Sequence, residues 1–201
     1  MLHRSSPTLT NLGPTHPAVP WDVLDLGCGT GLVGEVIAIH ARELVGVDLS
    51  AKMLERARER NCYTRLLRSD LLAALDAEPA CHHDVVTAGD VFIYVGNLDR
   101  VMASIRRVIR TGGVFAFTVE AAEDDGPAPG AADDTGYLLC ASGRYAHSAR
   151  YLEKLAAAHD FHVQLWRRIS LRLKGDAPGS MMGWLGVWRA TAPRDHAFSP
   201  A

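Results

Sequence analysis

The stretch VLDLGCGTG, residues 23–31, joins a short apolar run to a turn that contains three glycines. Residues 23–26 are typical of a buried strand, and the next apolar residues recur at helical spacing: Leu32, Val33, Val36 and Ile37. Glycine lets a backbone turn sharply and lets a ligand approach without meeting a Cβ atom. The stretch therefore predicts a strand, a glycine turn and a helix in that order, with a ligand site at the turn.

The alternation of strand and helix continues toward the C-terminus. Further strands are expected at 44–48, 63–68, 84–88 and 114–119, and helices at 50–60, 71–77 and 98–109. Ser50 is a suitable N-cap for the first of these helices, and Asn97 and Gly112-Gly113 are expected to bound the last. This order predicts a mainly parallel sheet with helices on both faces and right-handed crossovers.

The pattern changes after the fifth strand. Residues 120–147 are rich in Gly, Pro and acids, which predicts a long loop. This loop is expected either to be a mobile cover over the side of the site where an acceptor would bind or to be a simply solvated surface loop. Ser148 is expected to open a helix, and the period-2 pattern of 161–173 predicts a long strand. Residues 181–190 are expected to pair back on that strand as a hairpin.

Length and composition limit the class of protein. The 201 residues, with 21 Lys+Arg against 23 Asp+Glu, suit one soluble domain over 21–190, between an unstructured leader (1–20) and tail (191–201). The near-neutral charge disfavours a nucleic-acid partner, and no run approaches the ~18 apolar residues of a membrane span. The leader lacks the apolar core of a secretory signal, and the four cysteines form no CxxC pair, so a reducing cytoplasm is expected.

Three acids stand at the predicted ends of strands. Asp25 precedes the glycine turn, Asp48 follows it by about 20 residues, where an acid can accept hydrogen bonds from ribose hydroxyls, and Asp70 could meet an adenine amine. The spacing Gly29-x-Gly31-x-x-Gly34 also matches the dinucleotide fingerprint. A carboxylate at Asp25 would repel a pyrophosphate but would suit a ligand with a cationic amine, so an amino-acid moiety fits better.

Four stretches together resemble the successive motifs of class I S-adenosylmethionine-dependent methyltransferases over residues 22–119. They are VLDLGCGTGLVG, LVGVDLSAKMLERARER, LRSDLLAAL and DVVTAGDVFIYVGNLDRVMASIRRVIRTGGVFAFTVE. The later GYLLCASGRYAHSARYLEKLA is similar to the methyltransferase domains of tetratricopeptide-containing bacterial proteins. The resemblance implies a Rossmann-like, doubly wound, mostly parallel seven-stranded sheet whose last strand is antiparallel, which agrees with the C-terminal hairpin expected from the pattern.

The resemblance also implies a cofactor, S-adenosylmethionine, and the residues that hold it. It assigns the methionine part to Asp25 and the turn, the ribose to Asp48, the adenine to residues after strands two and three, and the reacting methyl to residues after strand four. The full set is Asp25, Gly27, Cys28, Gly29, Gly31, Asp48, Leu49, Met53, Asp70, Leu71, Gly89 and Asp90. Many relatives carry helices before strand one, so here either the pocket is more open or the chain is a fragment.

The reaction itself needs little from the protein, because the sulfonium of this cofactor is already activated. The protein must hold the acceptor in line with the methyl group and, for some acceptors, supply a base. Weak candidates for that base are Asp90, Tyr94, Tyr145 and His147, of which His147 could instead be a capping or packing residue and Tyr94 a core residue. No metal is expected, because the adjacent side chains of Cys81-His82-His83 rarely face one ion.

Methyl transfer to a small-molecule acceptor, or less readily a protein, is the function that these observations favour. A non-catalytic module that binds S-adenosylmethionine or S-adenosylhomocysteine is the alternative, and an NAD(P)-dependent oxidoreductase is the third hypothesis. No nucleic-acid or membrane partner is expected. The sequence leaves open the acceptor atom, the use of a base and the oligomeric state.

Overall fold

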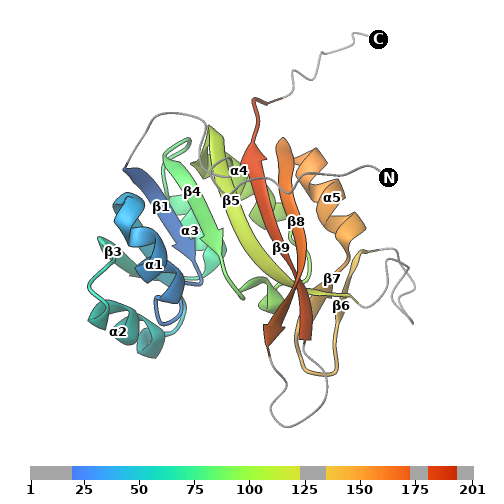
Figure 1. Cartoon of the computed structure of the whole chain (residues 1–201), viewed down its shortest axis with the longest axis horizontal. Coiled ribbons are helices and arrows are strands. Elements are labelled where there is room, and N and C mark those ends of the chain that lie inside the picture. The colour runs from blue at the N-terminus through green and yellow to red at the C-terminus, as the bar shows by residue number, and fades with distance from the viewer. Residues whose placement is uncertain (1–19, 123–134, 173–180, 194–201) are drawn as a thin grey trace, which may run out of the picture.

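Parallel strands make the centre of one mixed sheet in the computed structural model, which describes residues 20–122, 135–172 and 181–193. These strands are β1 (Trp21–Leu26), β2 (Ala41–Asp48), β3 (Arg65–Arg68), β4 (His83–Ala88) and β5 (Ile109–Ala121). Their spatial order is β3-β2-β1-β4-β5, so the chain first moves outward from β1 and then returns to its other side (Figure 1). The order of strands therefore reverses between β1 and β4, which is where open α/β sheets bind ligands.

The C-terminal hairpin is confirmed. β8 (Phe161–Arg172) and β9 (Met181–Ala190) pair antiparallel, and β9 adds to the sheet antiparallel to β5, with Phe115 opposite Trp188. The hairpin and the five parallel strands are the seven strands that were predicted, and the described residues form a sheet of nine strands in all. The aromatic rings of Phe115, Phe117 and Trp188 pack together on one face of the sheet. Side-chain packing therefore joins the hairpin to the central sheet in addition to the backbone hydrogen bonds between β5 and β9.

Two further short strands correct the prediction of a continuous loop at 120–147. β6 (Tyr137–Leu139) and β7 (Tyr145–His147) form a hairpin, and β7 runs parallel to the end of β5. β5 extends to Ala121 whereas its pairing with β4 ends at Phe117, so the last residues of β5 are left for β7 to pair with. The middle of the predicted loop, 123–134, lies outside the described residues.

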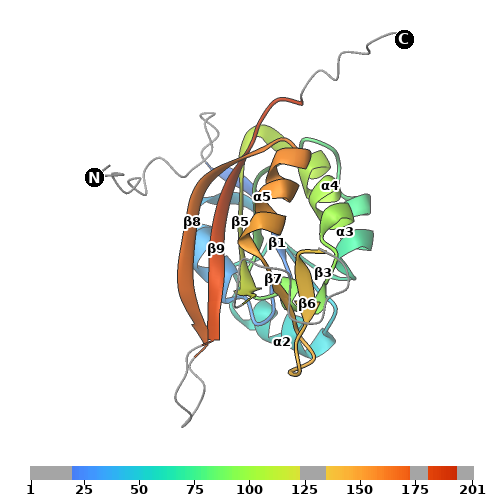
Figure 2. The same ribbon diagram turned by 90° about the vertical axis from the view of Figure 1, so that its right-hand side faces the viewer.

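Helices cover both faces of the sheet. α3 (Leu71–Ala77), α4 (Asp99–Val108) and α5 (Ala149–Ala158) pack on one face and form the larger core with residues such as Met102 and Leu152 (Figure 2). On the other face, α1 (Leu32–Ile37) and the 3-10 turn after it (Ala38–His40) border a smaller core around Val23, Leu44 and Val85. α2 (Ala51–Glu59) follows β2, and a second 3-10 turn spans Phe92–Tyr94. No helix among the described residues has the length and apolarity needed to cross a bilayer.

The caps of these helices are partly those expected. Ser50 and Ser148 accept hydrogen bonds from the backbone N–H of Met53 and Tyr151, which confirms both as N-caps. The end of α4 differs: the helix stops at Val108, and the chain is already paired with β4 at Ile109. Gly112 keeps its left-handed φ of 84°, but inside the strand rather than at a helix end.

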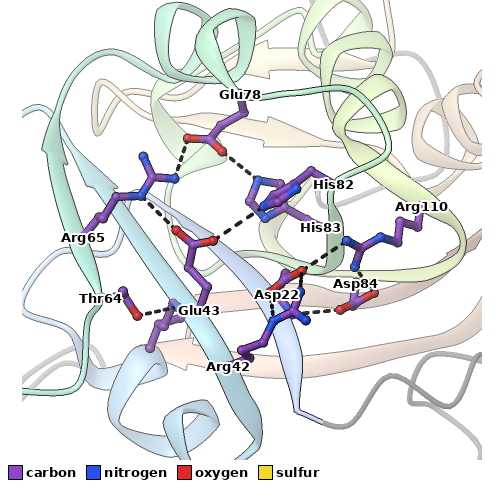
Figure 3. A network of polar contacts seen from close by, with 11 residues as sticks. Asp22, Arg42, Glu43, Thr64, Arg65, Glu78, His82, His83, Asp84 and Arg110 are labelled. Carbon is purple, nitrogen blue, oxygen red and sulfur yellow. Dashed lines mark hydrogen bonds and ion pairs between the residues drawn. The ribbon is translucent and has the colours of Figure 1, made fainter.

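A network of charged side chains fixes the amino ends of the central strands (Figure 3). Asp22 accepts hydrogen bonds from Arg42 (3.0 Å) and Arg110 (3.1 Å), and Arg110 also bonds Asp84. The side chains of Asp22 and Asp84 are each only 1% exposed. Burial opposes the ionisation of Asp22, but the hydrogen bonds and charges of Arg42 and Arg110 outweigh it and lower its pKa. The network therefore joins β1, β2, β4 and β5 at the edge opposite the glycine turn.

The two histidines of Cys81-His82-His83 belong to the same edge and point to different acids. His83 lies 3.0 Å from Glu78, His82 lies 3.5 Å from Glu43, and Arg65 bridges the two glutamates (Figure 3). Their rings are nearly perpendicular, at 87°. In the structure each histidine thus contacts its own glutamate within one polar network.

Candidate functional site

The glycine turn follows β1 at the point where the order of the strands reverses. Gly27, Gly29 and Gly31 have φ values of 63°, 55° and 85°, in the left-handed region that favours glycine. Two backbone bonds close the turn: the N–H of Cys28 donates to the carbonyl of Val47 (2.9 Å), and the N–H of Gly31 donates to that of Cys28 (2.8 Å). The turn is thereby joined to the end of β2 and not only to its own strand.

Asp48 connects this turn to the start of α2. One carboxylate oxygen accepts from the N–H of Gly29 (2.9 Å) and the other from the N–H of Ser50 (2.7 Å). The side chain is half-buried, and each carboxylate oxygen has a second lone pair. Its position at the end of β2, fixed by two backbone bonds, therefore suits an acceptor for ligand hydroxyls.

Asp25 lies beneath the turn, and its side chain does not face solvent. The residue is 1% exposed; the hydroxyl of Thr87 donates to one of its oxygens and the hydroxyl of Tyr63 to the other, both at 2.7 Å. Burial raises the pKa of Asp25, and the nearby charge of Asp48 acts in the same direction, against the two hydroxyl bonds. The sequence pattern predicts that Asp25 lies next to a ligand, and its only sign of Tyr63 is an aromatic residue at the start of the strand expected at 63–68.

Cys28 is inside the turn and is not a nucleophile. Its side chain is buried, and burial, together with the charges of Asp25 and Asp48, raises the pKa of the thiol to about 12. A thiol with this pKa stays protonated at neutral pH. The residue thus fills space within the turn, as expected for a small side chain.

The remaining predicted cofactor residues lie at neighbouring strand ends. Leu49 and Met53, after β2, are 70% and 42% exposed. Asp70 caps α3 by accepting from the N–H of Ala73 (2.9 Å), and Leu71 is the first residue of that helix. Gly89 and Asp90 directly follow β4. The topology thus gathers the predicted residues at the carboxyl ends of β1, β2, β3 and β4.

Comparison with known proteins agrees with this geometry. A sequence model of the methyltransferase domain family matches residues 23–113, which include the glycine turn and these strand ends. This part of the chain is similar to that family. The malonyl-[acyl-carrier protein] O-methyltransferase of Pectobacterium atrosepticum is 34% identical over 113 residues, 56% of this chain and 43% of that protein. The chain thus matches less than half the length of that relative.

Two further similarities extend beyond the matched domain. The trans-aconitate 2-methyltransferase of Azoarcus sp. strain BH72 is 28% identical over 173 residues, 81% of this chain and 66% of that protein. The solved S-adenosylmethionine dependent methyltransferase of Mesorhizobium loti has a TM-score of 0.62 at 20% identity, covering 85% of this chain and 91% of that one. The chain therefore has the predicted Rossmann-like fold.

The four candidate bases differ in how accessible they are. Asp90, with a left-handed φ of 55°, is exposed, and its N–H donates to the Thr118 hydroxyl (2.8 Å). Tyr94 is 69% exposed and is therefore not a core residue. Tyr145 is half-buried on β7. His147 is fully buried, lies 3.0 Å from the Gly96 carbonyl oxygen, and has its pKa lowered by burial to about 4. Its environment is that of a packing residue, whereas Asp90 and Tyr94 are open to a ligand.

Proposed function

We propose that this chain is a methyltransferase domain, which binds S-adenosylmethionine at the glycine turn and transfers its methyl group to a small-molecule acceptor. The observation that carries the proposal is the pair of carboxyl groups at the turn, Asp25 beneath it and Asp48 beside it, bonded to Tyr63, Thr87, Gly29 and Ser50. Two carboxylates favour a ligand that carries positive charge and disfavour a pyrophosphate. The cofactor carries both a sulfonium and an amino-acid ammonium group.

The residues present divide the binding of the cofactor among the strand ends. In this proposal Asp48 accepts hydrogen bonds from the ribose hydroxyls, and the turn Gly27–Gly31 passes close to the methionine part. Leu49 and Leu71 flank the adenine, with Met53 near them and Asp70 near its amino group. Gly89 and Asp90 lie beside the reacting methyl. When bound, the cofactor supplies an activated methyl group, and the chain orients the acceptor and keeps it in line.

The acceptor side would lie past the end of β4, where Asp90 and Tyr94 are exposed and the β6–β7 hairpin stands next to β5. Of the four candidate bases, we favour Asp90 and Tyr94 over Tyr145 and His147, because a base must reach the acceptor. The two named relatives act on carboxylic acids, malonyl-[acyl-carrier protein] and trans-aconitate, which makes small carboxylic acids the first acceptors to examine. The similarity to tetratricopeptide-containing proteins and the cytoplasmic location stay predictions.

The proposed function is tested in two steps. Calorimetric titration should show binding of S-adenosylmethionine and S-adenosylhomocysteine but not of NAD(H). Incubation with labelled S-adenosylmethionine and a panel of malonyl thioesters, trans-aconitate and phenols should then yield labelled product that the Asp90→Asn variant forms more slowly. Binding without turnover on the panel or on a metabolite extract would favour the non-catalytic module, and tighter binding of NAD(H) would favour an oxidoreductase.

Asp48→Ala should weaken the binding of S-adenosylhomocysteine by about tenfold to a hundredfold, because a charged acceptor of hydroxyl bonds is worth roughly 1.5–3 kcal/mol. The variant also loses the bonds to Gly29 and Ser50, so its melting temperature is measured alongside the calorimetric affinity. Asp76→Ala, an exposed acid on α3, serves as the control and should leave the affinity unchanged. Equal affinities for Asp48→Ala and wild type would place the ribose elsewhere.

A further inference from the structure

The ring of Tyr63 occupies a space that exists because two neighbouring residues have no side chain. A Cβ atom on Gly34 would lie 2.2 Å from the Tyr63 hydroxyl oxygen, and one on Gly46 would lie 2.7 Å from the ring. Gly34 is the inward-facing residue of α1, whereas Leu32 and Val36 on the same helix are 63% and 75% exposed. The third glycine of the Gly29-x-Gly31-x-x-Gly34 spacing is thus needed here to admit the phenol ring.

From this position the Tyr63 hydroxyl reaches the buried acid of the site. It lies 2.7 Å from Asp25, whose other oxygen accepts from Thr87. Burial and the Asp25 carboxylate raise the pKa of the Tyr63 phenol, so the phenol keeps its proton and is the donor in this bond. The two hydroxyls thereby fix the plane of the carboxylate and stabilise its charged form.

The same ring supports the glycine turn from behind. A Cβ atom on Gly31 would lie 3.0 Å from the ring of Tyr63 and 3.0 Å from Cδ of Arg60. Arg60 in turn donates to the carbonyl of Thr30 (2.6 Å) and pairs with Glu35. Tyr63 and Arg60 therefore pack against Thr30 and Gly31 and support this part of the turn.

We propose that Tyr63 is a positioning residue for the cofactor: it holds the Asp25 carboxylate in one orientation and supports the turn above it. The proposal rests on the proposed function at that turn. Tyr63 acts through Asp25 and Gly31, and its contribution is electrostatic as well as steric, since a carboxyl that becomes protonated no longer attracts the cationic groups of the cofactor.

This proposal predicts a pH dependence with a definite sign. The groups of the described residues that interact with Asp25 are the hydroxyls of Tyr63 and Thr87, the thiols of Cys28 and Cys62, and the like-charged carboxylate of Asp48. Loss of either hydroxyl removes a bond to the charged form and raises the pKa of Asp25 further. The affinity for the cofactor, which falls as the pH drops through that pKa, should therefore start to fall at a higher pH in Tyr63→Phe than in wild type.

The experiment compares Tyr63→Phe with Tyr151→Phe by calorimetric titration with S-adenosylhomocysteine between pH 5 and 8. Tyr151 is the control, because its hydroxyl is also hydrogen-bonded: it accepts from the N–H of Leu98 (2.8 Å) and donates to Oδ1 of Asn97 (3.4 Å). Tyr63→Phe should bind about tenfold more weakly at pH 7 and lose affinity at a higher pH than wild type. Thr87→Val should move the pH profile in the same direction, and Tyr151→Phe should match wild type in both respects.

A measurement without ligand separates this proposal from the proposed function. The pKa of the Asp25 carboxyl, followed by carbon NMR in the free protein, should be higher in Tyr63→Phe than in wild type, and the two tyrosine variants should melt at similar temperatures. An unchanged Asp25 pKa, or an unchanged affinity and pH profile in Tyr63→Phe, would overturn the positioning role. If the Asp25 pKa is higher in Tyr63→Phe as expected but wild type does not bind S-adenosylhomocysteine, the proposed function is overturned.

Discussion

Gly29→Val is expected to reduce the binding of S-adenosylhomocysteine by on the order of 100-fold or more while the domain stays folded. A Cβ atom at this position would lie no closer than 4.0 Å to the surrounding protein, its nearest neighbour being the Gly27 carbonyl. The protein therefore has room for a side chain, and the valine methyl groups would project into the space assigned to the methionine part of the cofactor. The left-handed φ of 55° adds backbone strain of about 1–2 kcal/mol.

Gly143→Val is the matched control for that strain. Gly143 has a φ of 76°, and a Cβ atom there would meet nothing within 4 Å. Both variants should lose a similar amount of stability in thermal unfolding, but only Gly29→Val should lose affinity in calorimetric titration. If Gly29→Val kept its affinity within threefold of wild type, the glycine turn would not be the ligand site.

Arg110→Met should lower the free energy of unfolding by about 3 kcal/mol at pH 7. The substitution leaves Asp22 and Asp84 buried, each 1% exposed, without the guanidinium that joins them. Removal of one partner from a fully buried ion pair costs about 3–5 kcal/mol, and the lower end applies because Arg110 itself is 30% exposed. Urea unfolding of wild type and variant measures the difference.

The effect of Arg110→Met should depend on pH in one direction. Because Arg42 and Arg110 lower the pKa of Asp22, its ion pairs contribute fully above the ordinary value of 3.8 and lose their contribution as the pH falls through the folded-state pKa. The difference between wild type and variant should therefore be constant from about pH 5 to 8 and narrow below about pH 4. Arg100→Met, which breaks an exposed pair with Asp76 at 3.6 Å, should change stability by less than about 1 kcal/mol. Equal losses in the two variants would contradict the structural role of the network.

The sequence by itself predicted the elements whose signals are local. Hydrophobic periodicity predicted the five parallel strands and the C-terminal hairpin, and Ser50 and Ser148 marked two helix starts because a cap bonds to a backbone N–H three residues away. The glycine turn and the acids after the strands were also predictable, since a parallel sheet brings all its carboxyl ends to one edge. What these patterns specify is each residue's place along the chain and its edge of the sheet.

The tertiary structure decided which side chains meet. The side chain of Asp25 points inward because it accepts hydrogen bonds from Tyr63 and Thr87, which are 38 and 62 residues away in the sequence. The residues around Asp25 in the sequence do not predict either of these partners. The strands β6 and β7 form because β5 extends beyond the end of β4 and leaves backbone groups for β7 to pair with. How far β5 extends beyond β4 depends on the register between two segments that are distant in the sequence. In both cases the physical cause is the same: a buried polar group must find a hydrogen-bond partner, and only the folded arrangement of the chain determines which partner is near.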